Sequence, residues 1–368
     1  MKKKLLALVC ALVMIFSLAS CGLSTPDTVG KVGDFEVSSG LYLLAQFSAY
    51  QQAAQLAGTD QDATDVKAFL KETITTDADS GETAVVQDYV ADKTLETLRT
   101  FAAIDARFAE LGGELTAEQT QVADNYAQQL MDQYGSTYTA NGIGLETLKA
   151  FERIQLKHTL LLTLVYGPDG ESPVDDSDLT EHLDSQMYEL AYVNIPLYNT
   201  STFVSASDDQ KAQAAAANCS ETQDGSVSEQ VSALHSAASA ALPDIYAVLD
   251  STPAEDASNV QTELLTESDL TGAFTQDGAA DAVRGLVYGE AAAVQYNAAS
   301  IILMMRIDPL QVSTLDALRT QILSDMKGDE LEDALTAYGS TLENDLSTSA
   351  MNKMPASKIV NPSSSSNS

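Results

Sequence analysis

Apolar residues recur every three or four positions along most of the chain, a spacing that places them on one face of a helix. The clearest run lies at 85–111, with an apolar face made of Leu95, Leu98, Phe101, Ile104, Phe108 and Leu111. Thr116 and Gln119 have the spacing of a capping box, so a second helix is expected to begin there. The same periodicity predicts one helix that begins at Ser38 or Ser39 and another that ends at Gly285. It also predicts helices over 145–165, 174–190, 208–219, 231–249 and 310–346.

Only a few segments alternate between apolar and polar residues as strands do. They lie at 29–37, with a turn at Gly33 and Asp34, at 189–199, at 291–296 and at 299–307. The stretch 58–84 is polar apart from a short helical patch at 66–70, and we expect it to be an insertion or a mobile loop. The predicted fold is mainly α, with a small α+β domain inserted before the last long helix.

The first 21 residues have the pattern of a secretory signal. Three lysines precede an apolar stretch, Leu5 to Leu18, that is short for a membrane span. The ending Leu18-Ala19-Ser20-Cys21 resembles the lipobox of bacterial lipoproteins. This resemblance implies that residues 1–20 are removed and that Cys21 is lipidated. The mature chain is then expected to be extracytoplasmic and anchored by lipid to the bacterial cell membrane.

The charge of the chain is strongly negative. Without residues 1–20 there are 16 basic and 53 acidic residues, a formal charge of −37. Binding to phosphate groups requires clustered lysine and arginine, so nucleic acid is excluded as a partner. The acidity favours solubility, and it also suits basic or still-unfolded exported chains.

The sequence predicts no metal site and no cofactor. After Cys21 the only cysteine is Cys219, which cannot form a disulfide framework or a cysteine-based metal site. Asp175, Asp176 and Asp178 match a calcium loop only in part, because the glycine and the terminal glutamate are missing, and we interpret them as helix-capping residues. The sequence contains no P-loop, GxSxG, HExxH or dinucleotide-binding motif.

The order of these parts resembles that of the extracytoplasmic foldases typified by the chaperone SurA and the lipoprotein PrsA. The likeness rests on "VGKVGDFEVSSGLYLL" (29–44), on the paired helices and glycine turn of 89–130, on 277–308 with its Gly289-Glu290 turn and closing hairpin, and on the tail "MNKMPASKIVNP" (351–362). In that family a helical chaperone domain surrounds a parvulin-type peptidyl-prolyl isomerase domain.

The resemblance implies a division of the chain into six parts. They are a lipoprotein signal peptide at 1–20, a tether at 21–28, a helical chaperone-like domain at 29–186, a parvulin-like domain at 187–308, a C-terminal helix at 309–350 that returns to the helical domain, and a tail at 351–368 that is disordered at its end.

The isomerases of this family carry a histidine on the first strand and another on the last strand of the parvulin domain. Here Asn194 and Ser300 occupy these positions, and the three histidines, His158, His182 and His235, all lie in predicted helices. Asparagine and serine form hydrogen bonds but do not titrate near neutrality. We therefore interpret the parvulin-like domain as degenerate and assign no catalytic residue.

The resulting hypothesis is a membrane-anchored chaperone that binds unfolded or newly exported proteins through its helical domain. Candidates for an apolar lining are Tyr42, Phe47, Tyr50, Phe101, Phe108, Tyr126 and Tyr134, each of which can also be an ordinary core residue. One alternative is an active prolyl isomerase, which needs a polar pair that the two strands do not offer. Another is a solute-binding or structural surface lipoprotein. A solute-binding protein needs more strands between its helices than the pattern predicts.

Overall fold

The structure is a computed structural model, and it describes residues 26–58, 65–78, 80–196, 198–199, 204–205, 225–248, 252, 255–297 and 300–361. Its internal contacts divide the chain into two units. Unit 1 consists of Met1–Val165 and Gly328–Ser368, and unit 2 consists of Tyr166–Lys327. The signal segment 1–20, Cys21, the expected helix at 208–219 with Cys219, and the end of the tail lie outside the described residues. None of the described helices combines the length and the apolar character needed to cross a membrane.

The expected boundary between the helical and parvulin-like domains is 186/187, whereas the first boundary between the two units lies at 165/166. Helix α7 (Asp176–Gln186) belongs to unit 2 because it packs against strand β5 (Met187–Pro196). Arg319 also connects α7 to the first part of α13 (Leu315–Thr341) through an ion pair with Asp176 at 2.8 Å. The chain therefore changes unit within the long helices α6 (Leu145–Tyr166) and α13.

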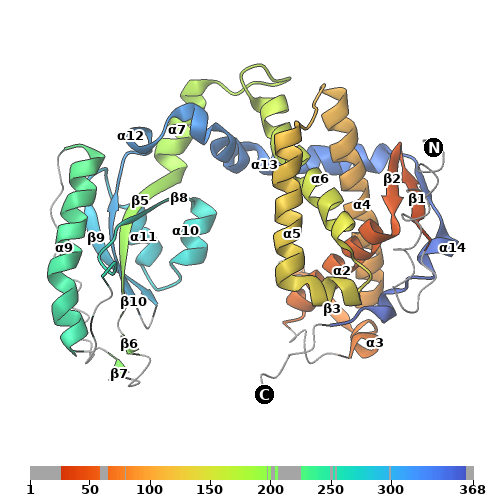
Figure 1. Cartoon of the computed structure of the whole chain (residues 1–368), viewed down its shortest axis with the longest axis horizontal. Coiled ribbons are helices and arrows are strands. Elements are labelled where there is room, and N and C mark those ends of the chain that lie inside the picture. Colours follow the sequence, from red (N-terminus) through yellow and green to blue (C-terminus); the bar gives the residue numbers. More distant parts are fainter. Residues whose placement is uncertain are drawn as a thin grey trace, which may run out of the picture. The chain divides into compact units, whose positions relative to one another are not determined.

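Unit 1 is mainly helical (Figure 1). Besides most of α6 and the end of α13, its elements are β1 (Thr28–Val32), β2 (Phe35–Ser38), α2 (Ser39–Leu56), α3 (Val66–Phe69), β3 (Thr73–Asp77), β4 (Glu82–Val85), α4 (Val86–Glu110), α5 (Ala117–Ala140), β11 (Asn344–Leu346), α14 (Thr348–Met351) and the 3-10 helix η1 (Ala356–Lys358).

Local sequence accounts for where these helices begin and what they bury. The side chain of Ser38 caps α2 by accepting from the Leu41 N–H at 3.1 Å. The capping box expected at the start of α5 is confirmed, since the Thr116 and Gln119 side chains each accept from the other residue's backbone N–H. Helices α2 and α4 pack on each other through apolar faces that include Tyr50 and Val90. The predicted periodicity thus forms the core of unit 1.

The short helical patch expected at 66–70 is present as α3, whereas the alternative of a mobile loop does not hold for the described residues of 58–84. Helix α3 is followed by an antiparallel hairpin of β3 and β4, in which Ile74 pairs with Ala84. Phe69, Leu70 and Ile74 are buried against α2 and α4. These three apolar residues fix the segment, although the polar residues around them conceal the strand pattern.

The structure also corrects the expectation of a single helix at 310–346. Helix α12 (Pro309–Val312) comes first, α13 ends at Thr341, and β11 then pairs antiparallel with β1. The sheet order is β11-β1-β2, so the C-terminal segment lies beside the strand that begins the described chain. Gly30 faces Leu346 in this register with a φ of +125°, a conformation that glycine adopts readily and other residues do not.

The described part of the tail is held by polar contacts that are partly or fully buried. The Asn141 side chain donates to the Val360 carbonyl at 2.9 Å and accepts from the Val360 N–H at 2.8 Å. The Gln46 amide donates to the Met354 carbonyl at 3.2 Å. Residues 351–361 therefore form a strap across α2 and the end of α5.

Unit 2 is built on one antiparallel sheet in the order β8-β5-β10-β9. Besides α7, α12, β5 and the first part of α13, its elements are β6 (Tyr198–Asn199), β7 (Val204–Ser205), α9 (Val227–Val248), β8 (Gln261–Thr266), α10 (Glu267–Ala273), α11 (Ala279–Arg284), β9 (Ala291–Asn297) and β10 (Ser300–Arg306).

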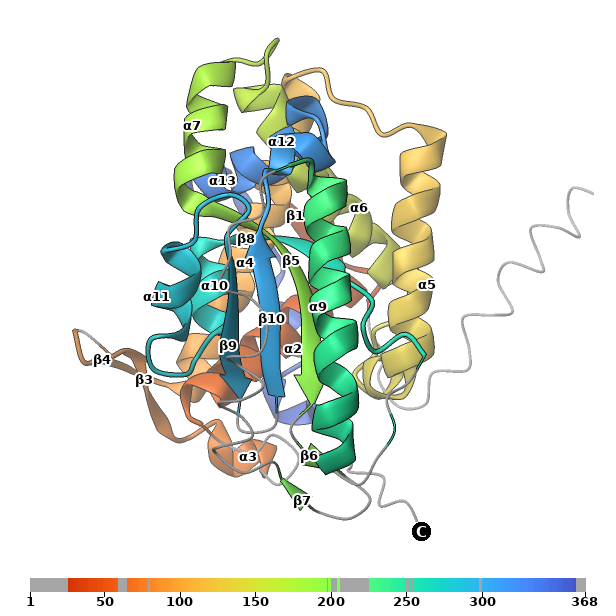
Figure 2. The same cartoon turned by 90° about the vertical axis from the view of Figure 1, so that its left-hand side faces the viewer.

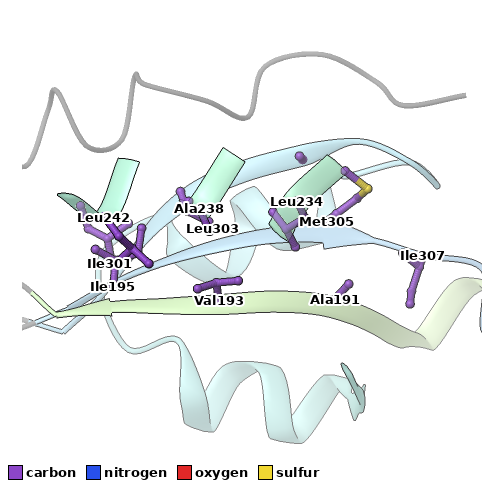
Figure 3. Packing of buried hydrophobic residues seen from close by; sticks show 11 residues of the cluster. Ala191, Val193, Ile195, Leu234, Ala238, Leu242, Ile301, Leu303, Met305 and Ile307 are labelled. Carbon is purple, nitrogen blue, oxygen red and sulfur yellow. The ribbon is translucent and has the colours of Figure 1, made fainter. Parts of the chain in front are cut away.

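Helices cover both faces of this sheet (Figure 1). Helix α9 packs along β5 and β10 (Figure 2). Its residues Leu234, Ala238 and Leu242 meet alternate strand residues such as Val193 and Leu303 (Figure 3). The opposite face of the sheet packs against α10 and α11. Because the sheet is buried on both sides, six of the seven residues of β10 are buried. The part of the chain that the structure describes is thus mainly α with a small α+β unit.

Candidate functional site

Unit 1 contains a cavity of about 710 Å³ between four helices. Residues from α2, α4, α5 and α6 line it, namely Leu44, Ala45, Phe47, Ser48, Gln51, Thr97, Phe101, Tyr134, Thr137, Tyr138, Phe151 and Gln155. Its volume is within the range of small-ligand pockets, and it is large enough to receive a few apolar side chains.

Aromatic rings form the walls of this cavity as two edge-to-face pairs. Phe101 and Phe151 have ring centroids 5.9 Å apart, and Tyr134 and Tyr138 have centroids 6.4 Å apart. Burial raises the pKa of Tyr138, with smaller contributions from Tyr134 and Glu152. Tyr134 is 46% exposed, so the rings extend from a buried floor to the surface. Such paired rings bind apolar groups without fixing their identity.

The polar residues of the lining are all neutral. Gln51, Gln155 and Thr97 offer donors and acceptors beside the rings, and no lysine, arginine, aspartate or glutamate is among the described residues that line the cavity. A peptide segment presents apolar side chains together with unpaired backbone N–H and C=O groups. The mixture of rings, amides and hydroxyls can therefore satisfy both parts of such a segment.

The structure separates the aromatic residues that the sequence analysis grouped together. Phe47, Phe101 and Tyr134 line the cavity, whereas Tyr42, Tyr50 and Phe108 are core residues. Tyr126 is 57% exposed on α5 and lies outside the cavity. Sequence reasoning missed Tyr138 and Phe151, although Tyr138 lies one helical turn after Tyr134 and this spacing is a usable signal.

Unit 2 has a second cavity, of about 580 Å³, on the face of the sheet that carries α10 and α11. Asn194 is exposed and lines it, together with Tyr192 of β5, Glu263 of β8, Phe274 and Tyr296. The alternation of Leu190, Tyr192 and Asn194 on β5 points all three toward this cavity. That alternation is the signal by which Tyr192 could have been found.

The two predicted site positions, Asn194 and Ser300, are not paired across the strands. Asn194 is opposite Ile302 in the antiparallel register, and Ser300 is opposite Pro196. Ser300 is buried and is not part of the cavity lining. The structure therefore brings Asn194 to the cavity, but it does not place Ser300 there as a direct partner.

None of the three histidines lines either cavity. His158 is in α6, where burial lowers its pKa and the charge of Glu332 opposes this shift. The Nε2 atom of His182, in α7, is 2.6 Å from Asp325 of α13. His235, in α9, contacts Ser258 at 3.3 Å. Among the residues that the structure describes, no group of three or more histidine, cysteine, aspartate or glutamate side chains has an arrangement that could hold a metal ion.

Comparison with known proteins gives likenesses in structure but none in sequence. No known protein family matches the sequence, and a search of curated proteins found no match. The foldase protein PrsA from Streptococcus pneumoniae is similar in structure, at 11% sequence identity and a TM-score of 0.36, over 75% of this chain and 97% of that chain. PrsA from Bacillus subtilis is similar at 12% identity and a TM-score of 0.29, over 77% of this chain and 93% of that chain. Both TM-scores are low.

Proposed function

We propose that this protein is a chaperone-like lipoprotein, anchored through Cys21 outside the cytoplasm, that binds unfolded segments of exported proteins. The observation that carries the proposal is the neutral, aromatic cavity between the four helices of unit 1. The signal-like N-terminus supports a location outside the cytoplasm, and the acidic composition supports a soluble domain there. Because the paired rings recognise apolar surface rather than one ligand shape, they suit clients of different sequence.

The proposal predicts that the cavity suppresses aggregation. A denatured secretory protein is diluted into buffer with the chain from residue 21 onward, in which Cys21→Ser prevents lipidation, and light scattering is recorded. We expect suppression at near-stoichiometric amounts. Tyr134→Gln should require about fivefold more protein for the same suppression, because losing one aromatic contact costs about 1 kcal/mol.

The matched control is Tyr126→Gln, which removes another exposed tyrosine from α5 but lies outside the cavity. It should suppress aggregation as well as the parent protein does. Equal losses in the two variants would show that any exposed ring is sufficient and would remove the cavity from the proposal. A complete lack of suppression by the parent would instead favour a solute-binding or structural lipoprotein.

We further propose that the unit 2 cavity does not isomerise prolyl bonds. Asn194 is the only predicted site residue that lines this cavity. The residue opposite Asn194 in the strand pairing is Ile302, which does not titrate. In a protease-coupled assay with a prolyl peptide, the cis-to-trans rate should stay at the uncatalysed value, a relaxation of tens of seconds or more.

The alternative, an active isomerase, predicts a faster relaxation that depends on Asn194. Asn194→Ala would then abolish the acceleration, while Asn125→Ala on the exposed surface of α5 would leave it intact. Detecting that pattern would overturn the assignment of a non-catalytic cavity.

A further inference from the structure

The cavity of unit 2 differs from that of unit 1 in its charge. Two carboxylates, Glu263 and Asp269, are among its lining residues, and the part of the lining that the structure describes contains no basic side chain. Three aromatic rings stand beside them. Phe274 and Tyr296 form an edge-to-face pair with centroids 5.7 Å apart, and Tyr192 lies on the neighbouring strand β5. Carboxylates and ring faces both attract organic cations.

A hydrogen bond positions the main carboxylate of this cavity. The Tyr192 hydroxyl donates to Glu263 Oε2 at 3.3 Å, across the pairing of β5 with β8. Burial raises the pKa of Tyr192, and the negative charge of Glu263 raises it further. Glu263 is exposed on the edge strand β8 and lines the cavity, so its carboxylate is open both to the cavity and to solvent.

The rest of unit 2 offers little to neutralise that charge. Its sequence, 166–327, has 26 acidic and 5 basic residues. Arg284 is already paired with Glu267 and Asp281, and Arg319 with Asp176 and Asp316. The guanidinium of Arg306 stacks on the rings of Tyr188 and Tyr288 at 5.0 and 5.2 Å. The field at the cavity is consequently attractive to a cation from outside.

We infer that the unit 2 cavity binds a lysine or arginine side chain of an extended peptide segment. The alkyl stem packs on Phe274, Tyr296 and Ile302, and the charged end meets Glu263. The volume of about 580 Å³ accommodates such a side chain with parts of its neighbours. This site goes beyond the proposed chaperone function, because it lies in the other unit and selects charge, whereas the unit 1 cavity is neutral.

The test measures peptide binding directly, by fluorescence anisotropy with the chain from residue 21 onward carrying Cys21→Ser. Three labelled peptides are identical except at one central position, which is lysine, its uncharged analogue norleucine, or glutamate. At about 20 mM salt the lysine peptide should bind roughly tenfold more tightly than the norleucine peptide, and the preference should shrink at about 0.5 M salt. The glutamate peptide should bind most weakly.

Two isosteric variants locate the preference. Glu263→Gln should reduce the ratio of lysine to norleucine affinity to within about twofold. Glu255→Gln removes the same charge from an exposed position of unit 2 outside the cavity, and it should keep the full ratio. Equal affinities for the lysine and norleucine peptides in the parent protein, or equal effects of the two variants, would overturn the inference. Because binding is read without an aggregating client, the result does not depend on the outcome of the light-scattering experiment.

Discussion

Gly30→Val is expected to lower the free energy of unfolding of unit 1 by about 4 kcal/mol or more. Gly30 has a φ of +125°, which a β-branched residue does not adopt without strain. A Cβ atom at this position would overlap the carbonyl oxygen of Asp345 and lie 2.9 Å from the Leu346 Cα. Since both neighbours are backbone atoms of β11, the clash cannot be relieved by a side-chain rotation. Urea unfolding followed by far-ultraviolet circular dichroism measures the loss.

Gly144→Ala is the control for this prediction. Gly144 has no heavy atom within 4 Å of the position of its added Cβ and no positive φ, and it lies at the N-cap of α6, so alanine should cost about 1 kcal/mol at most. A loss in Gly30→Val no larger than that of Gly144→Ala would mean that the pairing of β11 with β1 contributes little to unit 1. The expected large loss would show that the returning C-terminal segment is part of its fold.

Leu303→Ala should destabilise unit 2 by about 3–5 kcal/mol. Leu303 is fully buried in the middle of β10, between Val193 of β5 and Ala293 of β9 in the strand register (Figure 3). Its side chain belongs to the cluster that packs against α9, including Leu234 and Ala238. Truncation leaves a cavity that the paired strands cannot close, because their backbone hydrogen bonds fix their spacing.

Calorimetry is the measurement of choice, since the two units allow separate transitions. Val287→Ala removes an apolar side chain that is 60% exposed in the same unit and should cost about 0.5 kcal/mol or less. If Leu303→Ala were no more destabilising than Val287→Ala, the packing of α9 on the sheet would not be a main source of stability in unit 2.

The helices of unit 1 could be predicted because their information is local. The spacing of Leu98, Phe101 and Phe108 defines a buried face of α4, and the Thr116–Gln119 capping box defines the start of α5. Strand β8 could not be predicted in this way. Its sequence QTELLT lies at the edge of the sheet with three exposed residues, so it shows no clear alternation.

The two cavities show the same limit. By sequence alone, Phe47 and Phe101 cannot be distinguished from the core residues Tyr50 and Phe108. Only the packing of the four helices decides which of these rings line a cavity. In unit 2, Glu263 is distant in sequence from Tyr192, and the antiparallel pairing of β5 with β8 brings them together. Chain position alone does not encode such a pairing.

The sequence by itself determined the helical periodicity, the excess of acidic residues and the lack of histidine on β5 and β10, because these follow from residue type and local spacing. Only the tertiary structure decided that β11 pairs with β1, that Asn194 faces a cavity while Ser300 is buried, and that Glu263 stands beside aromatic rings. These are contacts between residues far apart along the chain. They depend on how whole faces pack together, and many local patterns are compatible with more than one such packing.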